Sequence, residues 1–153
     1  MSAKRQSLTV LVADDDDDDR GFIKKAWDQN RAVNDLRFVE DGEELTQYLN
    51  HEGRYSDPAS SPRPAVILLD LNMPRKDGRE ALREIKANPD LRQIPIIVLT
   101  TSQSDEDIRT SYDLGANSFV TKPVTFGGLV EVLQVLGTYW IEIVDLPPES
   151  IGV

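Results

Sequence analysis

The sequence predicts an α/β fold, a doubly wound parallel sheet of five strands with helices on both faces. Short apolar runs alternate along the chain with amphipathic stretches of helical spacing, and this strand-helix order occurs five times. Strands that alternate with helices form βαβ units, whose right-handed crossovers place helices on both faces of a parallel sheet. The length of 153 residues and the 39% of hydrophobic residues suit one soluble domain with a real core.

The first unit begins with an apolar run, Leu8 to Ala13, which predicts a buried strand. The strand runs directly into a series of aspartates, Asp14 to Asp19. A helix is expected next, because apolar side chains recur at helical spacing from Phe22 to Trp27. The acidic residues suit the N-terminal dipole of that helix, and Asp17 or Asp18 is the expected N-cap.

The second and third strands have different patterns. The stretch from Leu36 to Glu40 alternates, which predicts a short strand, and Glu43 to Leu49 predicts a short helix. The polar segment 50–64 is expected to be a surface loop, because the segments on either side are too small to fold alone. The run from Ala65 to Pro74 predicts a strand that is buried on both faces and ends at Asp70.

The rest of the chain continues the same order. The expected elements are a helix between Asp77-Gly78 and Asn88-Pro89, a strand from Ile96 to Leu99, a helix from Asp105 to Gly115, a strand from Asn117 to Thr121, and a last helix from about Thr125 to Ile143. A proline-rich tail follows. The expected organisation is a disordered segment at 1–7, one domain at 8–144 and a C-terminal tail at 145–153.

Composition excludes several functional classes. The net charge is −10, whereas proteins that bind nucleic acids present a basic face. The chain has no cysteine, so disulfides, thiol nucleophiles and zinc-cysteine sites are excluded. No apolar stretch approaches the length that spans a bilayer, and the N-terminal residues lack the apolar core of a signal peptide. Neither nucleic acid nor membrane is therefore an expected partner, and the expected compartment is the cytoplasm.

The strand ends carry the chemistry, because the carboxyl ends of parallel strands meet at the edge of the sheet where ligands bind. There the chain places Asp14 and Asp15 after the first strand, Asp70 after the third, Thr100 after the fourth and Lys122 after the fifth. Clustered carboxylates raise a pKa or bind a cation, and hard oxygen ligands favour Mg²⁺. Lys122 and Thr100 suit phosphoryl oxygens. The set is expected to move a phosphoryl group onto Asp70.

Each of these residues also has an ordinary structural interpretation. A run of aspartates is often a solvated loop. Asp70 could be a cap, Thr100 a turn residue and Lys122 an exposed residue. A calcium loop of the EF-hand type does not fit, because its Gly position holds Asp19 and its final Glu position holds Lys25. Turn chemistry explains each residue singly, but it does not explain their convergence at four strand ends.

The motifs resemble those of response-regulator receiver domains of two-component signalling, the CheY-like family. They are Leu11-Val12-Ala13-Asp14-Asp15, Leu69-Asp70-Leu71-Asn72-Met73-Pro74, Asp77-Gly78, Val98-Leu99-Thr100 and Thr121-Lys122-Pro123. The resemblance covers residues 8–144 and implies a flavodoxin-like sheet with strand order 2-1-3-4-5. Asp16 to Asp19 depart from the family, in which Pro often follows the acidic pair.

The resemblance implies a metal site and a phosphoacceptor. Asp70 would accept the phosphoryl group, and Asp14 and Asp15 would form the acidic pair. The implied metal site comprises Asp14, Asp15, Asp70 and Asn72. Mg²⁺ or Mn²⁺ would bind Asp15, Asp70 and the backbone carbonyl of Asn72.

The same resemblance implies a switch. Thr100 would supply its hydroxyl group, and Lys122 would contact the phosphoryl group. Phe119 would occupy the aromatic switch position, although its ring offers no hydroxyl group to bond. The peptide bond between Lys122 and Pro123 is expected to be cis, as in that family.

A narrower resemblance concerns the small stand-alone regulators of bacterial phytochrome histidine kinases. It rests on three sequence segments, which are the loop 50–64, the segment from Asp70 to Glu80 and the C-terminal segment from Tyr139 to Pro147. The expected function is that of a single-domain response regulator that is phosphorylated by a sensor histidine kinase, since the one histidine, His51, lies in the loop. Such a protein is not a conventional enzyme, because it catalyses only its own phosphorylation and dephosphorylation.

Two alternative functions remain open. A Mg²⁺-dependent phosphatase with an aspartyl-phosphate intermediate would need a second acid where Asn72 stands. A receiver-like scaffold would never be phosphorylated, which the intact acidic pair argues against.

The last helix carries more apolar surface than one core face needs. Phe126, Val130, Leu133, Trp140 and Val144 can form one stripe, and Val132, Val135, Tyr139 and Ile143 can form a second. Both stripes could pack into the core and under the tail. An exposed second stripe would instead mark a partner surface, and a homodimer through this helix region is the expected assembly.

Overall fold

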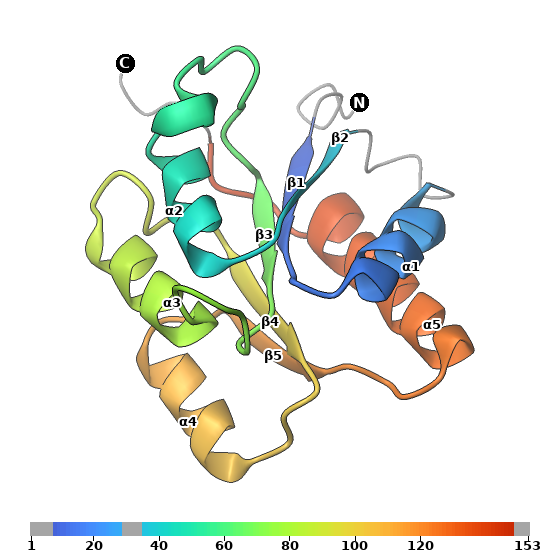
Figure 1. Ribbon diagram of the computed structural model, residues 1–153. Coiled ribbons are helices and arrows are strands. Elements are labelled where there is room, and N and C mark those ends of the chain that lie inside the picture. Colours follow the sequence, from blue (N-terminus) through green and yellow to red (C-terminus); the bar gives the residue numbers. More distant parts are fainter. Residues whose placement is uncertain (1–7, 29–34, 149–153) are drawn as a thin grey trace.

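In the part of the chain that the structure describes, five parallel strands form a sheet in the order β2-β1-β3-β4-β5. The structure is a computed structural model that describes residues 8–28 and 35–148 (Figure 1). The strands are β1 (Thr9–Ala13), β2 (Asp35–Val39), β3 (Val66–Leu69), β4 (Ile96–Thr100) and β5 (Ser118–Thr121). The predicted fold class and strand order are confirmed. The segment 1–7, predicted to be disordered, and the end of the predicted tail, 149–153, lie outside the described residues.

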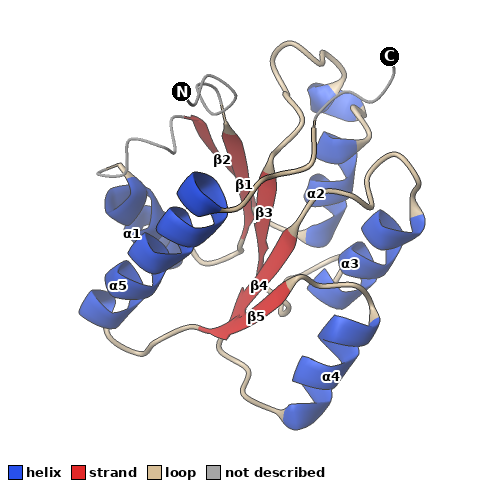
Figure 2. Cartoon of the chain, turned by 180° about the vertical axis from the view of Figure 1, so that it is seen from behind, coloured by secondary structure: helices blue, strands red, loops and turns tan. Residues whose placement is uncertain are grey.

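Helices cover both faces of the sheet. They are α1 (Asp17–Trp27), α2 (Gly42–Leu49), α3 (Gly78–Ala87), α4 (Asp105–Asp113) and α5 (Phe126–Leu136). Helices α1 and α5 pack side by side on one face, and α2, α3 and α4 lie on the other (Figure 2). The segment 50–64 contains one 3₁₀ turn, Gly53–Tyr55, labelled η2. Among the described helices, none combines the length and apolar character that crossing a membrane requires.

The central strands are buried on both faces because successive side chains of a strand point to opposite sides of the sheet. In β1, Leu11 and Ala13 join the core under α2 and α3, whereas Val10 and Val12 join the core under α1 and α5. Strands β3 and β4 alternate in the same way. Each fully buried aliphatic side chain contributes about 1.5–3 kcal/mol to folding. The residues that follow these strands are therefore held on a well-packed support.

Side-chain caps determine where the helices begin. The N-caps of α2, α3, α4 and α5 are Asp41, Asp77, Ser104 and Thr125. Helix α1 is capped by Asp16, whose Oδ1 accepts hydrogen bonds from the amides of Asp18 and Asp19 at 2.9 and 3.2 Å. The predicted cap, Asp17 or Asp18, is therefore wrong. Both residues lie inside the first turn, where their charges meet the helix dipole.

The chain after α5 departs from the predicted continuous helix. Helix α5 ends at Leu136, and residues Gly137–Ile143 (η3) continue in wider π turns, with the Val144 amide bonded to the Tyr139 carbonyl at 2.9 Å. In a regular α-helix, Ile141 would lie about 80° around the axis from the buried Leu133. The wider turns rotate less per residue, and Ile141 is buried in the core beside α1 and α5.

Candidate functional site

Two neighbouring strands, β1 and β3, bring three carboxylates together. Asp14 and Asp15 follow β1 directly, and Asp70 follows β3. The two strand ends are aligned, since the Asp70 amide donates to the Ala13 carbonyl at 3.0 Å. One carboxylate oxygen of each aspartate lies within 4.8 Å of the other two. Asp14 and Asp70 are buried, whereas Asp15 is exposed, so the cluster has one open side.

Lys122 reaches this cluster from the end of β5. Its backbone amide donates to the Thr100 carbonyl at 2.7 Å, which extends the ladder between β4 and β5. Its Nζ lies 2.7 Å from Asp19 Oδ2, 2.8 Å from Asp14 Oδ2 and 3.5 Å from Asp70 Oδ2. The Lys122 side chain is only 6% exposed. Charge-assisted hydrogen bonds in such a water-poor setting are stronger than those between neutral groups.

The cluster carries an excess of negative charge. Burial raises the pKa of the Asp70 carboxyl above its usual range, although Lys122 and Thr100 pull it down. Burial likewise raises the pKa of Asp14, against the opposing effect of Lys122. Burial alone would lower the pKa of Lys122, but Asp14, Asp19 and Asp70 hold it well above its ordinary value. A cation between the carboxylates would relieve this imbalance.

Thr100 presents a buried hydroxyl group to the same site. It is the last residue of β4, it is fully buried, and its Oγ1 has no hydrogen-bond partner of ordinary geometry among the described residues. The hydroxyl nevertheless lies close enough to Asp70 to lower the pKa of that carboxyl. Leaving a buried hydroxyl unsatisfied costs about 1–3 kcal/mol. An incoming oxygen acceptor beside Asp70 would satisfy it.

The loop between β3 and α3 passes very close to Asp70. The Gly78 amide donates to the Leu71 carbonyl at 2.8 Å, and a Cβ at Gly78 would lie 2.3 Å from the Asp70 carbonyl oxygen. Any side chain at position 78 would clash with the Asp70 backbone, so only glycine fits there. This steric requirement explains the glycine of the Asp77-Gly78 motif. The amide of Asn72 interacts with the Asp70 carboxylate and lowers the pKa of Asp70. The Asn72 backbone therefore lies beside the carboxylates.

Phe119 lies apart from the carboxylates. Its ring is half-buried and packs against the core under α2 and α3. Its backbone amide donates to the Tyr112 hydroxyl at 3.2 Å, which joins β5 to α4. Phe119 lies on β5, three residues before Lys122, which directly follows that strand, so a rearrangement at Lys122 has a short path to this contact.

The expected cis peptide bond between Lys122 and Pro123 is wrong for this structure. No peptide bond among the described residues is cis. The trans form of a bond before proline is favoured by about 0.5–1 kcal/mol in the absence of other constraints. With the trans bond, the Lys122 side chain still reaches Asp14.

Two residues of the first turn of α1 take part in the site without having been predicted. Asp19 binds Lys122, and the Arg20 guanidinium donates to the backbone carbonyl of Asp14 at 2.7 Å. Asp19 was expected only to complement the helix dipole. Its spacing of one helical turn from Ile23, which is buried, places both on the inner side of α1. That spacing is the signal that could have identified it.

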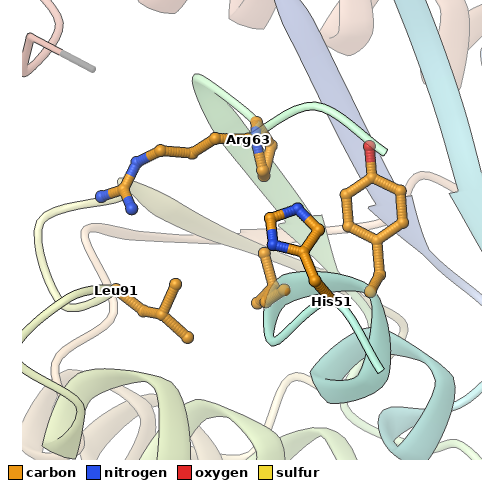
Figure 3. Close-up of a pocket in the computed structure, with 6 residues that line it drawn as sticks. His51, Arg63 and Leu91 are labelled. Atoms are coloured by element: carbon orange, nitrogen blue, oxygen red, sulfur yellow. The ribbon is translucent and has the colours of Figure 1, made fainter. Parts of the chain in front are cut away.

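A separate cavity of about 90 Å³ lies at the other end of β3. Figure 3 shows His51, Arg63 and Leu91 around it, and Pro64, two residues before β3, completes that side. His51 Nε2 lies 2.9 Å from the Ser61 carbonyl, so Nε2 carries the proton and donates. His51 is thus in the predicted loop, near the end of β3 that is opposite to Asp70.

Comparison with known proteins identifies the same family that the motifs resemble. The family model of the response regulator receiver domain matches residues 10–134. Response regulator Rcp1 of Synechocystis sp. is 39% identical over 138 residues, which is 90% of this chain and 92% of that protein.

Two solved structures agree closely with this fold. The Mn²⁺-bound form of response regulator Rcp1 has a TM-score of 0.87 at 38% identity and covers 93% of this chain and 100% of its own. The phosphorylated cyanobacterial phytochrome response regulator RcpA has a TM-score of 0.87 at 38% identity, over 92% of this chain and 99% of its own. With its sheet order and its strand-end residues, the chain belongs to the response regulator receiver domain family.

Proposed function

We propose that this protein is a response regulator that accepts a phosphoryl group on Asp70 from a phosphohistidine of a sensor kinase. The observation that carries the proposal is the position of the Asp70 carboxylate. It is buried beside Asp14 and Asp15, with Lys122 Nζ at 3.5 Å and the unpartnered Thr100 hydroxyl next to it. A phytochrome-type kinase is the proposed partner, because the relative RcpA is a phytochrome response regulator.

The transfer step follows from nucleophilic displacement at phosphorus. An Asp70 carboxylate oxygen attacks the phosphorus atom in line, the bond between phosphorus and the imidazole nitrogen breaks, and the nitrogen keeps the electron pair. Hydrolysis later transfers the group to water and restores the carboxylate. The protein catalyses these two steps on itself and turns over no other substrate, which is why we do not describe it as a conventional enzyme.

The donor set fits Mg²⁺ or Mn²⁺. Three carboxylate oxygens within 4.8 Å of one another are hard ligands with surplus negative charge. Asp14, Asp15, Asp70 and the carbonyl of Asn72 would hold the ion, and the ion would offset the charge between the carboxylate and the phosphoryl group. The relative Rcp1 has been solved in a Mn²⁺-bound form, which supports this assignment.

Thr100 and Lys122 would distinguish the phosphorylated from the unphosphorylated protein by contacting the phosphoryl group. Each offers a donor to a phosphoryl oxygen, and neither contact exists before phosphorylation. This difference in contacts shifts the population toward an active conformation. Phe119 would follow the movement of β4 and β5, because its ring is only half-buried and its backbone is tied to α4 through Tyr112.

Phosphotransfer measurements test the proposal. Purified protein should take up label from an autophosphorylated phytochrome kinase and from acetyl phosphate with Mg²⁺, whereas Asp70→Asn should take up none. Glu80→Gln, a change of an exposed carboxylate on α3, is the matched control and should behave like the wild type. Uptake by Asp70→Asn at the wild-type rate would move the site elsewhere, and no uptake by any form would favour the scaffold.

We also propose that the protein forms a homodimer through its last helix region in the cytoplasm. The second predicted stripe is largely exposed, with Val135 at 63%, Tyr139 at 52% and Ile143 at 63%. Two copies of a chain with a net charge of −10 repel each other, so an apolar stripe is the surface on which they can meet. Sedimentation should give a dimer at micromolar concentration and a monomer for Tyr139→Glu. A wild-type monomer with and without a phosphoryl analogue would refute it.

A further inference from the structure

The four aspartates after the acidic pair have different contacts. Asp16 caps α1, and Asp17 forms an ion pair with Arg20. Asp19 forms an ion pair with Lys122. Asp18 has an exposed side chain, and no ion pair found among the described residues includes it. The acidic segment is therefore more than a solvated run of charge, because one member reaches the functional lysine.

Lys122 is fully engaged before any phosphoryl group arrives. Its ammonium has three protons to donate, and carboxylate oxygens of Asp19, Asp14 and Asp70 lie at 2.7, 2.8 and 3.5 Å. The contact to Asp70, the proposed phosphoacceptor, is the longest of the three. Phosphorylation removes the charge of the Asp70 carboxylate and frees this long contact, but the ammonium stays held toward Asp14 and Asp19. A phosphoryl oxygen on Asp70 can therefore bind it closely only if one of these two carboxylates loosens its contact.

Asp19 is the carboxylate that can leave most easily. Its side chain is 23% exposed, whereas that of Asp14 is 3% exposed. A carboxylate that loses its partner next to water is rehydrated at once, but a buried one pays the full desolvation cost. Asp14 also accepts a hydrogen bond from the Asp16 amide at 2.9 Å, which fixes it in place.

We propose that Asp19 is a positioning residue that holds Lys122 in the unphosphorylated protein and is displaced from it by the phosphoryl group. The inference rests on the proposed function. The contact between Asp19 and Lys122 must break when the phosphoryl group binds Lys122, so the free energy of that contact reduces the affinity for the phosphoryl group. Asp19 therefore determines how readily the phosphorylated conformation forms. Since Asp19 belongs to the first turn of α1, its release also reports phosphorylation to that helix.

The test compares Asp19→Asn with Asp18→Asn, which removes the same charge from the same helical turn without touching Lys122. Beryllofluoride, a phosphoryl analogue, is titrated at saturating Mg²⁺. Asp19→Asn should bind it about threefold to tenfold more tightly than the wild type, the range expected for one partly exposed charge-assisted hydrogen bond. Asp18→Asn should stay within about twofold, and Asp19→Glu, which restores the carboxylate, should return toward the wild type.

A second readout isolates the contact itself. In protein with ¹⁵N-labelled lysine, the Lys122 ammonium signal of the analogue-free protein should shift in Asp19→Asn and not in Asp18→Asn. At saturation with the analogue, the signals of all three proteins should coincide, because Asp19 no longer contacts the lysine. A merely structural role would not give a difference that disappears on binding.

The outcomes separate this inference from the proposed function. If the wild type binds beryllofluoride and Asp19→Asn binds no more tightly than Asp18→Asn, the role of Asp19 is refuted and the proposed function stands. An unshifted Lys122 signal in analogue-free Asp19→Asn refutes it as well. If neither the wild type nor the variants bind the analogue, the proposed function fails and this inference fails with it.

Discussion

Lys122→Met removes the ammonium around which the carboxylates of the site are arranged. Methionine keeps a similar length and volume, so packing changes little. The Lys122 contacts to Asp14 and Asp70 are buried, with side-chain exposures of 3% and 9% for the two carboxylates. Removing one partner of a buried ion pair costs about 3–5 kcal/mol. The Asp19 contact is partly solvated and adds less. We therefore expect metal-free Lys122→Met to lose about 3–5 kcal/mol of unfolding free energy at neutral pH.

This loss should depend on pH in a defined direction. Without Lys122, the largest effect that opposes burial is lost, so the pKa values of Asp14 and Asp70 rise further above the value of 3.8 for an ordinary carboxyl. A carboxyl whose folded pKa exceeds its unfolded pKa favours folding below the unfolded value, and this contribution is lost as the pH rises through the folded pKa. The variant should therefore recover stability as the pH falls from neutral toward the ordinary pKa of a carboxyl.

Urea unfolding in EDTA, followed by far-ultraviolet circular dichroism, measures both effects. Lys24→Met is the control, because it removes an exposed lysine-aspartate pair at 3.4 Å and should cost at most about 0.5 kcal/mol. Added Mg²⁺ at neutral pH should restore part of the stability of Lys122→Met by binding the folded state. A loss equal to that of the control, or a loss that grows on acidification, would refute the electrostatic account.

Three further variants test individual features. Thr100→Val replaces an unpartnered buried hydroxyl with a methyl group, so the unfolding free energy should stay the same or rise by about 1 kcal/mol, while beryllofluoride binding weakens at least tenfold; a clear loss of stability would contradict this. Gly78→Ala places a Cβ 2.3 Å from the Asp70 carbonyl oxygen and should lower both stability and Mg²⁺ affinity, whereas Gly127→Ala, which has open space around it on α5, should lower neither. Trp27→Phe should cost about 2–3 kcal/mol in urea unfolding, because it opens a cavity and removes the indole hydrogen bond to the Leu133 carbonyl that joins α1 to α5; an unchanged midpoint would show that this contact is not needed.

The convergence of Asp14, Asp70, Thr100 and Lys122 was predictable because it follows from topology. Once five apolar runs are assigned to one parallel sheet, the residues after them must meet at one edge. Neighbouring strands then fix the spacing, as the hydrogen bond between Asp70 and Ala13 shows. No knowledge of the loops was needed for this step.

Other features depend on packing that the sequence pattern does not contain. The N-cap of α1 is Asp16 and not one of the two predicted aspartates. Several consecutive aspartates can cap equally well, and only the backbone geometry decides between them. The π turns after Leu136 accompany the burial of Ile141 in the core, which is a tertiary contact that no local pattern contains. The helical spacing from Ile23 places Asp19 on the inner side of α1, but no local pattern identifies its partner Lys122, which is 103 positions away.

The contact between Tyr112 and Phe119 has a consequence for solubility at high concentration. Strand β5 is the last strand of the sheet, and such a strand offers unpaired backbone amides to any extended chain that approaches it. The Tyr112 hydroxyl already accepts the hydrogen bond of the Phe119 amide. A second molecule that aligned along this strand would have to displace the tyrosine before it could add to the sheet. The side chain thereby protects the folded protein against edge-to-edge aggregation at this position.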